Sequence, residues 1–160
     1  MRIKCKMNED FHGGIEVKNK DRLSLNELNC FLVNEFPQCH CSVISSDELT
    51  AHVRYEISEQ DLRPGGSVSG PTLMKVADVA LYIGVLSNKG LIPLALTTNF
   101  SINFFKKPNA DKAIIGECQL LKVGKNLVVG QVLLFSEGEP AMLAHATGTY
   151  SIPPSKNLET

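Results

Sequence analysis

The 160-residue chain contains no tryptophan, and aromatic residues make up only 6% of it. Neither sign of charge is in excess, because 16 Lys and Arg stand against 17 Asp and Glu. Nucleic-acid binding depends on a surplus of positive charge, so we expect no nucleic-acid partner. No apolar run is long enough to cross a bilayer, and the charged first residues are not followed by the apolar core of a secretory signal. These absences favour a cytoplasmic protein with no membrane association.

The chain has five cysteines, an odd number scattered over the sequence: Cys5, Cys30, Cys39, Cys41 and Cys118. This pattern fits a reducing compartment better than a disulfide framework. Cys39-His40-Cys41 brings potential zinc ligands together, but no second pair follows at the spacing of a zinc site. We therefore expect neither a metal nor another resident cofactor.

A chain of this length with 43% hydrophobic residues can bury one sizeable core. Residues 1–22 show neither helical nor strand periodicity, which predicts a flexible N-terminal arm. Residues 23–154 are predicted to form a single domain, and residues 155–160 a polar tail.

The domain is predicted to begin with a helix that starts after Ser24, with Glu27 completing a capping box, and stops before Pro37. Residues 43–45 and 49–57 then show the alternation of two strands.

The second half of the domain is predicted to contain four strands, at residues 94–104, 114–123, 127–136 and 141–152. The second and third of these, joined by Gly124-Lys125-Asn126, are predicted to form a hairpin. The first of these has the cleanest alternation. Its apolar face would carry Leu94, Leu96, Thr98, Phe100, Ile102 and Phe104, and its polar face Thr97, Asn99, Ser101 and Asn103.

Between these halves, residues 73–86 are apolar on nearly all sides, as in a helix buried inside its own domain. A loop rich in turn residues, at residues 62–72, leads into this helix, and within it Ser69 is a candidate N-cap and Pro71 is tolerated in a first helical turn. One acid, Asp78, interrupts the apolar run. A buried carboxylate is costly unless it is paired or hydrogen-bonded, and Asp78 lies too deep to be explained by the helix dipole.

Two interpretations of Asp78 are open. In the first, Thr72, Lys75, Asp78 and Tyr82 form a polar stripe that faces water or a partner. In the second, which we favour because the stripe is narrow, Asp78 is a catalytic carboxylate that faces a cleft.

The order of elements predicts an α+β fold, in which a curled antiparallel sheet wraps around the long central helix and a second helix stands at the N-terminus. Small residues at three- and four-residue steps, Ala77, Ala80 and Gly84, would let that helix approach the sheet closely.

This architecture resembles the hotdog-fold acyl-CoA thioesterases of the phenylacetic-acid-degradation (PaaI-like) type. The resemblance covers roughly residues 31–154 and is closest in residues 63–74 with Ala77-Asp78, in Thr97-Thr98-Asn99 with residues 102–104, and in residues 144–147 with Thr149-Tyr150.

Members of that family commonly carry His-Gly-Gly before the helix, and an Asp or Glu eight residues after the first glycine. Gly70 and Asp78 keep this spacing. Ser69 stands at the position of the His, Pro71 at the second Gly, and Arg63 where many members have an Asn. A second match, His12-Gly13-Gly14, is followed by a polar, uncapped segment, and we regard it as accidental.

The resemblance implies hydrolysis of a fatty or aryl acyl-CoA thioester. Asp78 would act as base or nucleophile, the Gly70 N–H would polarise the carbonyl, and Ser69 and Thr97 would complete the catalytic set. Asp78 of one subunit would face Gly70 of the other across a homodimer interface, and assembly into a homotetramer is a further option.

Coenzyme A carries phosphates, which bind Lys and Arg. The candidate substrate-binding residues, chosen from the loop, the long strand and the segments after it, are Arg63, Gly66, Pro71, Thr98, Asn99, Lys106, Lys107 and Lys125. Lys122, close to Lys125 in the sequence, is a further candidate for a phosphate contact.

Two other functions stay open. A hotdog hydratase or dehydratase needs a His near the loop before the helix, and no His occurs between His52 and His145. We expect His145 to be a partly buried, hydrogen-bonded residue of a strand. A non-catalytic acyl-CoA-binding domain is favoured by the missing His, whereas the acid inside an apolar helix argues against it.

Overall fold

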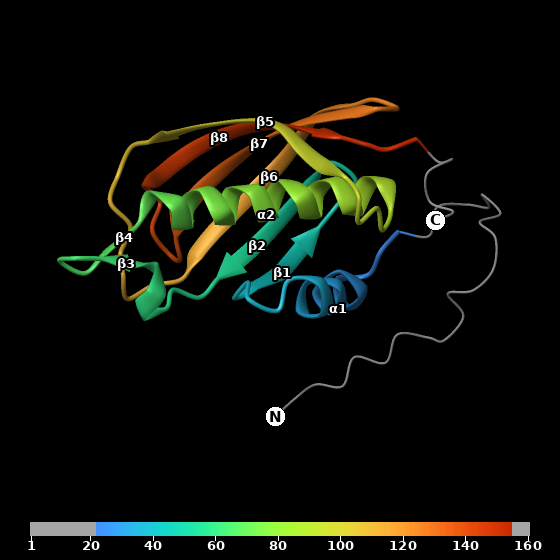
Figure 1. Ribbon diagram of the computed structural model, residues 1–160. Helices are drawn as coiled ribbons and strands as arrows, with labels where there is room; N and C mark the ends of the chain where they lie inside the picture. Colours follow the sequence, from blue (N-terminus) through green and yellow to red (C-terminus); the bar gives the residue numbers. More distant parts are fainter. Residues whose placement is uncertain (1–21, 155–160) are drawn as a thin grey trace.

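A 20-residue helix, α2 (Gly70–Lys89), runs along one face of a six-stranded antiparallel sheet in the computed structural model of the chain (Figure 1). The structure describes residues 22–154. The predicted arm, the predicted tail and His12-Gly13-Gly14 lie outside these residues, apart from Arg22. The sheet order is β1-β2-β6-β7-β8-β5. The bounds are β1 (Cys41–Ser46), β2 (Thr50–Tyr55), β5 (Leu96–Phe104), β6 (Ile114–Val123), β7 (Leu127–Ser136) and β8 (Met142–Ser151).

The N-terminal helix α1 (Leu25–Glu35) lies beside β1 (Figure 1). Its predicted capping box is confirmed: the Ser24 hydroxyl accepts a hydrogen bond from the Glu27 N–H at 3.2 Å, and the Glu27 carboxylate accepts one from the Ser24 N–H at 2.8 Å. The side chain of Asn29 joins α1 to β1, because it accepts from the N–H of Val43 at 2.8 Å and donates to its carbonyl at 3.0 Å.

The contact between α2 and the sheet depends on small side chains, as predicted. A Cβ atom on Gly84 would lie 2.7 Å from the sulfur of Cys118, and one on Gly116 would lie 3.2 Å from the Cβ of Ala80. The first distance leaves no room for a Cβ atom and the second is shorter than an ordinary contact, so α2 packs closely on β6 at these points.

A short hairpin precedes α2, where the sequence predicted only a loop rich in turns. A 3₁₀ turn, η1 (Glu59–Asp61), leads into β3 (Leu62–Arg63), which pairs with β4 (Ser67–Val68). The turn between the two strands contains Gly65 with φ 90° and Gly66 with φ 71°, a left-handed conformation that favours glycine.

Strand β5 forms one edge of the sheet and departs from the predicted alternation. Thr97 pairs with Tyr150 and Asn99 with Thr149, so the register against β8 shifts between Thr97 and Asn99. Phe100 and Ile102 pack against the core, as predicted. The predicted position of Thr97 on the polar face is wrong, because this bulge turns its hydroxyl toward α2.

Cys39, Cys41 and Cys118 are free thiols. Cys30, by contrast, is disulfide-bonded, which the number and spacing of the cysteines did not lead us to expect. Within residues 22–154, none of the helices combines the length and the apolar character needed to span a membrane.

Candidate active site

The carboxylate of Asp78 lies where α2 passes β5 and β8, two turns into the helix. Its Oδ1 atom accepts hydrogen bonds from Thr97 Oγ1 at 2.9 Å and from the Tyr150 hydroxyl at 2.9 Å. No described residue donates a hydrogen bond to Oδ2. One oxygen is therefore held in place by two hydroxyl groups, and the other is available to a ligand.

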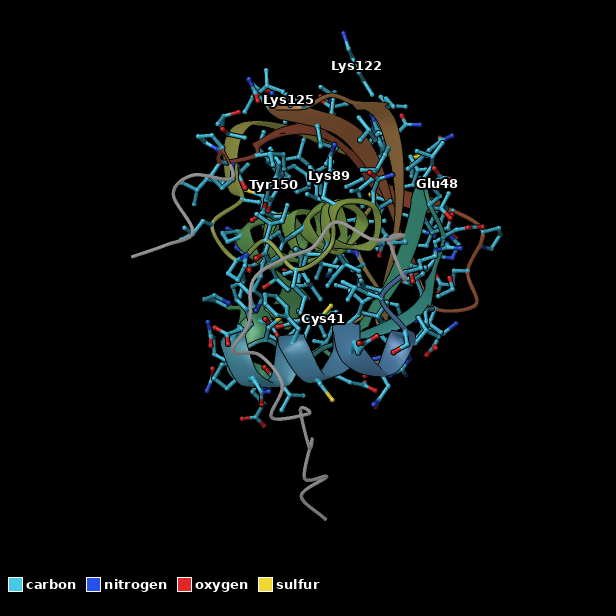
Figure 2. The ribbon with its side chains drawn as sticks, turned by 90° about the vertical axis from the view of Figure 1, so that its right-hand side faces the viewer. Cys41, Glu48, Lys89, Lys122, Lys125 and Tyr150 are labelled. Atoms are coloured by element: carbon cyan, nitrogen blue, oxygen red, sulfur yellow. The ribbon has the colours of Figure 1, made fainter. Side chains whose placement is uncertain are left out.

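Tyr150 is buried, with 4% of its surface exposed, and lies between α2 and the sheet (Figure 2). Its ring stacks on that of Tyr82 with the centroids 5.6 Å apart. Burial and the neighbouring negative charge of Asp78 raise the pKa of Tyr150, so its hydroxyl keeps its proton and acts as a donor. The sequence analysis did not select Tyr150. The available signal was the alternation of the last strand, which places Tyr150 on the same face as Gly148, the face that packs on α2.

A surface pocket of about 300 Å³ opens beside Asp78 and is lined also by Met74, Lys75, Thr97 and Phe100. Its walls are mostly apolar, and Asp78 is its acidic residue; the Lys75 side chain lines it, but the ammonium group of Lys75 lies on Tyr55 and Asp61. A pocket of this kind suits an apolar acyl group whose reactive end must lie next to a carboxylate.

The polar stripe considered for α2 is not a solvated face. Of the four residues, Thr72 and Tyr82 are buried, Asp78 is partly exposed and only Lys75 is exposed. This geometry favours the interpretation of Asp78 as a functional group over that of a residue on a wet helix surface.

The N-terminus of α2 forms a second part of the candidate site. Ser69 is the N-cap as predicted, and its hydroxyl accepts from the Thr72 N–H at 3.3 Å and lies 2.9 Å from the Thr72 hydroxyl. Its catalytic role stays a prediction, since this side chain is engaged in the cap. Gly70 is the first helical residue, and its N–H donates to no described acceptor, so it is available to a ligand.

A groove of about 550 Å³ runs past Gly70 and brings together four residues that the sequence analysis selected separately: Arg63, Gly70, Lys106 and Lys107. Phe104, Phe105 and apolar side chains of β4 and α2 line the rest of it. The groove therefore combines three cationic side chains, apolar surface and an available backbone N–H.

The remaining predicted residues line neither the Asp78 pocket nor this groove, and their roles stay predictions. Gly66 lies in the β3–β4 turn, and Pro71 lines a separate pocket together with Tyr55 and Asp61. The Thr98 hydroxyl donates to the Thr149 carbonyl at 3.2 Å, Asn99 is exposed on β5, and Lys125 lies in the β6–β7 turn (Figure 2).

His145 lies on β8 with its Nε2 atom 3.1 Å from Oε1 of Gln131. It is partly buried and hydrogen-bonded, which confirms the structural role expected for it.

A buried polar cluster that the sequence analysis missed supports the first turns of α2. Asp61, 4% exposed, accepts hydrogen bonds at Oδ1 from Tyr55 at 2.8 Å, Thr72 at 3.1 Å and Lys75 at 3.3 Å. Its Oδ2 accepts from the N–H and the hydroxyl of Ser58 at 2.8 and 2.9 Å. Burial alone would raise the pKa of Asp61, but these hydrogen bonds and the charge of Lys75 lower it to about 2. The spacing of Ser58 and Asp61, that of a capping box, was the signal.

Gly70 and Asp78 cannot serve the same carbonyl within one chain. They are eight positions apart on α2, which corresponds to a rise of about 12 Å. A carbonyl within hydrogen-bond reach of the Gly70 N–H is therefore out of reach of the Asp78 carboxylate of the same helix.

The family model of the thioesterase superfamily matches residues 65–142. A crystal structure described as that of a candidate thioesterase, from Silicibacter sp. TM1040, is 41% identical in sequence, with 82% of this chain and 93% of that chain covered and a TM-score of 0.76. No curated protein matches the chain.

Two further solved structures share the fold at lower identity. The PaaI protein of the E. coli phenylacetic acid degradation operon is 23% identical, with 77% of this chain and 94% of that chain covered and a TM-score of 0.65. A hypothetical thioesterase protein from Streptococcus pneumoniae TIGR4, solved with coenzyme A, is 18% identical, with coverages of 81% and 97% and a TM-score of 0.68. These likenesses confirm the predicted fold.

Proposed function

The chain belongs to the thioesterase superfamily, and we propose that it hydrolyses the thioester bond of a fatty or aryl acyl-coenzyme A. The observation that carries the proposal is the Asp78 carboxylate, which lines a mostly apolar pocket and has Oδ1 held by two hydroxyl groups, while no described residue donates to Oδ2. Such an arrangement fixes the carboxylate in orientation while leaving one oxygen for chemistry.

Asp78 can act in two ways. As a base, its Oδ2 takes a proton from water while the water oxygen bonds to the thioester carbon; the carbon–sulfur bond then breaks, and the thiolate of coenzyme A leaves and is protonated. As a nucleophile, Oδ2 itself bonds to that carbon and expels the thiolate, and water then hydrolyses the resulting anhydride. Both routes consume one water and yield a carboxylic acid and free coenzyme A.

The negative charge that develops on the thioester oxygen needs a donor, and the Gly70 N–H at the start of α2 is suited to this role. The positive end of the helix dipole adds to its hydrogen bond, and one such donor typically contributes roughly 3 kcal/mol of transition-state stabilisation. Since Gly70 and Asp78 of one helix lie too far apart, we propose that the donor belongs to a second copy of the chain.

The edge strand β5 supports this dimer. It exposes apolar side chains, with Leu96 67% and Phe104 50% exposed. Antiparallel pairing of two β5 strands about a twofold axis near their middle would set Thr97 of one copy beside Phe104 of the other. The ring of Phe104 lies 3.6 Å from the position of a Cβ on Gly70. The partner's Gly70 would therefore approach Asp78, and each dimer would have two complete sites.

The groove beside Gly70 is the proposed binding site for coenzyme A. Arg63, Lys106 and Lys107 would contact its phosphates, and the exposed rings of Phe104 and Phe105 would contact its apolar parts. The coenzyme A bound to the S. pneumoniae protein of the same fold supports this choice of ligand.

The test is release of free thiol from a panel of acyl- and aryl-CoA substrates by the wild type, Asp78→Asn and a control, Asp111→Asn. Asp111 is exposed in the segment before β6, so Asp111→Asn removes one negative charge, as Asp78→Asn does, but leaves the Asp78 pocket unchanged. We expect Asp78→Asn to lose about 100-fold or more in kcat while staying folded and dimeric, and the control to match the wild type. Equal activity of all three proteins would refute the role of Asp78.

The engaged hydroxyl of Ser69 favours one alternative, a domain that binds acyl-CoA without hydrolysing it. In that case calorimetry would detect binding of acyl-CoA, and no thiol would be released. A hydratase would change the acyl chain of an enoyl-CoA while leaving the thioester intact, so a mass spectrum of the product separates it from both other functions.

A further inference from the structure

We infer that Tyr55 and Asp61 are positioning residues for Asp78: they hold the ammonium group of Lys75 away from the Asp78 carboxylate, which therefore stays free of an ion pair. The inference rests on the proposed function, in which Asp78 Oδ2 must be available to water or to a thioester.

Lys75 and Asp78 would be expected to pair. They lie three residues apart on α2, a separation that makes side chains neighbours on a helix surface, and they line the same pocket. No hydrogen bond or salt bridge joins them in the structure. The Lys75 ammonium instead lies 2.5 Å from the Tyr55 hydroxyl and 3.3 Å from Asp61 Oδ1.

Three contacts hold the Lys75 ammonium beside Tyr55 and Asp61. Besides the two hydrogen bonds, its nitrogen lies 4.6 Å from the centroid of the Tyr55 ring, within the range of a cation–π interaction. Both anchors are rigid, because Tyr55 is buried in the core and Asp61 is fixed by Ser58 and Thr72.

The negative charge of Asp61 also favours this position of the Lys75 ammonium. Asp61 is a buried carboxylate, and Lys75 is the cation that forms a salt bridge with it. A buried carboxylate that loses its cation is strongly destabilised, whereas Asp78 is partly exposed and already has two hydroxyl donors. The ammonium is therefore more stable on Asp61 than on Asp78.

The consequence concerns Oδ2 of Asp78. A lysine ammonium that reached this carboxylate would donate to Oδ2, the oxygen without a donor, and would occupy the position that water or the thioester needs. It would also weaken the carboxylate as a base and as a nucleophile.

A double-mutant cycle tests the inference through activity. Tyr55→Phe removes the hydroxyl but keeps the ring, and it is made in the wild type and in a Lys75→Met background. We expect kcat for acyl-CoA hydrolysis to fall about tenfold in the wild-type background and less than about twofold in the Lys75→Met background. A loss by the same factor in both backgrounds would show a structural effect of Tyr55 and overturn the inference.

Asp61→Asn, made in the same two backgrounds, gives a second cycle in case one hydrogen bond suffices to hold the ammonium. We again expect a larger loss of kcat in the wild-type background than in the Lys75→Met background. If neither Tyr55→Phe nor Asp61→Asn lowers kcat while both proteins stay folded and dimeric, the inference is overturned as well.

Crystal structures of the two variants give a readout that needs no activity. We expect the Lys75 nitrogen to move within about 4 Å of an Asp78 oxygen in at least one of them. If the wild type releases no thiol from any substrate, the proposed function fails, and these structures still decide where Lys75 goes. An ammonium that stays in its original place in both variants refutes the positioning role.

Discussion

The hydroxyl of Tyr150 donates a 2.9 Å hydrogen bond to Oδ1 of Asp78, the same oxygen that accepts a hydrogen bond from Thr97. Two donors from adjacent strands thus converge on one carboxylate oxygen. The orientation of the carboxylate is fixed without engaging Oδ2, the oxygen that the proposed chemistry requires.

We predict that Tyr150→Phe lowers kcat about tenfold, because Oδ1 loses one of its two donors, and lowers the free energy of unfolding by about 1 kcal/mol, the typical net value of one hydrogen bond. Steady-state kinetics and urea unfolding measure the two effects. Tyr82→Phe is the matched control, since Tyr82 stacks on Tyr150 but its hydroxyl donates to the Pro93 carbonyl, at 3.4 Å, and not to Asp78. Equal losses of kcat in both variants would contradict the role of Tyr150.

The adjacent threonines Thr97 and Thr98 should behave differently. Thr97→Val removes a donor to Asp78 and is expected to lower kcat about tenfold with a small change in KM. Thr98→Val removes only a hydrogen bond to the Thr149 carbonyl and is expected to keep kcat within about twofold. A larger loss of kcat in Thr98→Val than in Thr97→Val would mean that Thr98, and not Thr97, supports the reaction.

This bulge illustrates what the sequence could and could not predict. The capping box of α1, the N-cap of α2 and the β6–β7 hairpin depend on residues close together in the chain, so local patterns predicted them. The phase of β5 depends on its pairing with β8, about fifty residues away, and simple alternation placed Thr97 on the wrong face.

The candidate site shows the same division. Asp78 and Gly70 were predicted, because a lone acid in an apolar helix and a fixed spacing are visible in the sequence. Tyr150 and the cluster around Asp61 were missed, because their partners come from different elements and meet only in the folded chain.

Gly70→Ala should separate folding from catalysis. A Cβ at this position would meet the Phe104 ring at 3.6 Å, an ordinary contact, so we expect the free energy of unfolding to change by less than about 1 kcal/mol. The new methyl group would stand where a thioester approaches the N–H, so kcat/KM is expected to fall about tenfold or more. If Gly70→Ala is folded and its kcat/KM is unchanged, the proposed role of the Gly70 N–H is refuted.

Lys106 and Lys107 should affect the affinity for coenzyme A and leave the chemistry intact. Their combined replacement by Ala is expected to raise KM for acyl-CoA about tenfold, with little change for an acyl-N-acetylcysteamine thioester, which has no phosphates. Lys122→Ala is the control, because Lys122 is exposed on β6 and is not among the residues that line the groove. A similar rise of KM for both thioesters would place the effect on the acyl group and contradict phosphate binding.

Asp61 should make the stability of the protein sensitive to acid over a defined range of pH. Its folded-state pKa is lowered to about 2, whereas an aspartate in an unfolded chain titrates near 4. The unfolded state therefore binds the proton more readily, and Asp61 contributes about 2 kcal/mol of stability above about pH 4 that is lost as the pH falls toward 2.

The measurement is urea unfolding of the wild type, Asp61→Asn and the surface control Asp111→Asn at several values of pH between about 6 and 2. The gap between wild type and Asp61→Asn should be largest near neutral pH and shrink by about 2 kcal/mol below pH 4, because only the wild type loses the ionised carboxylate. The control should follow the wild type throughout. A gap that stays constant with pH would mean that Asp61 stabilises the fold through its shape and hydrogen bonds alone, and that its charge, and with it the ion pair to Lys75, contributes nothing.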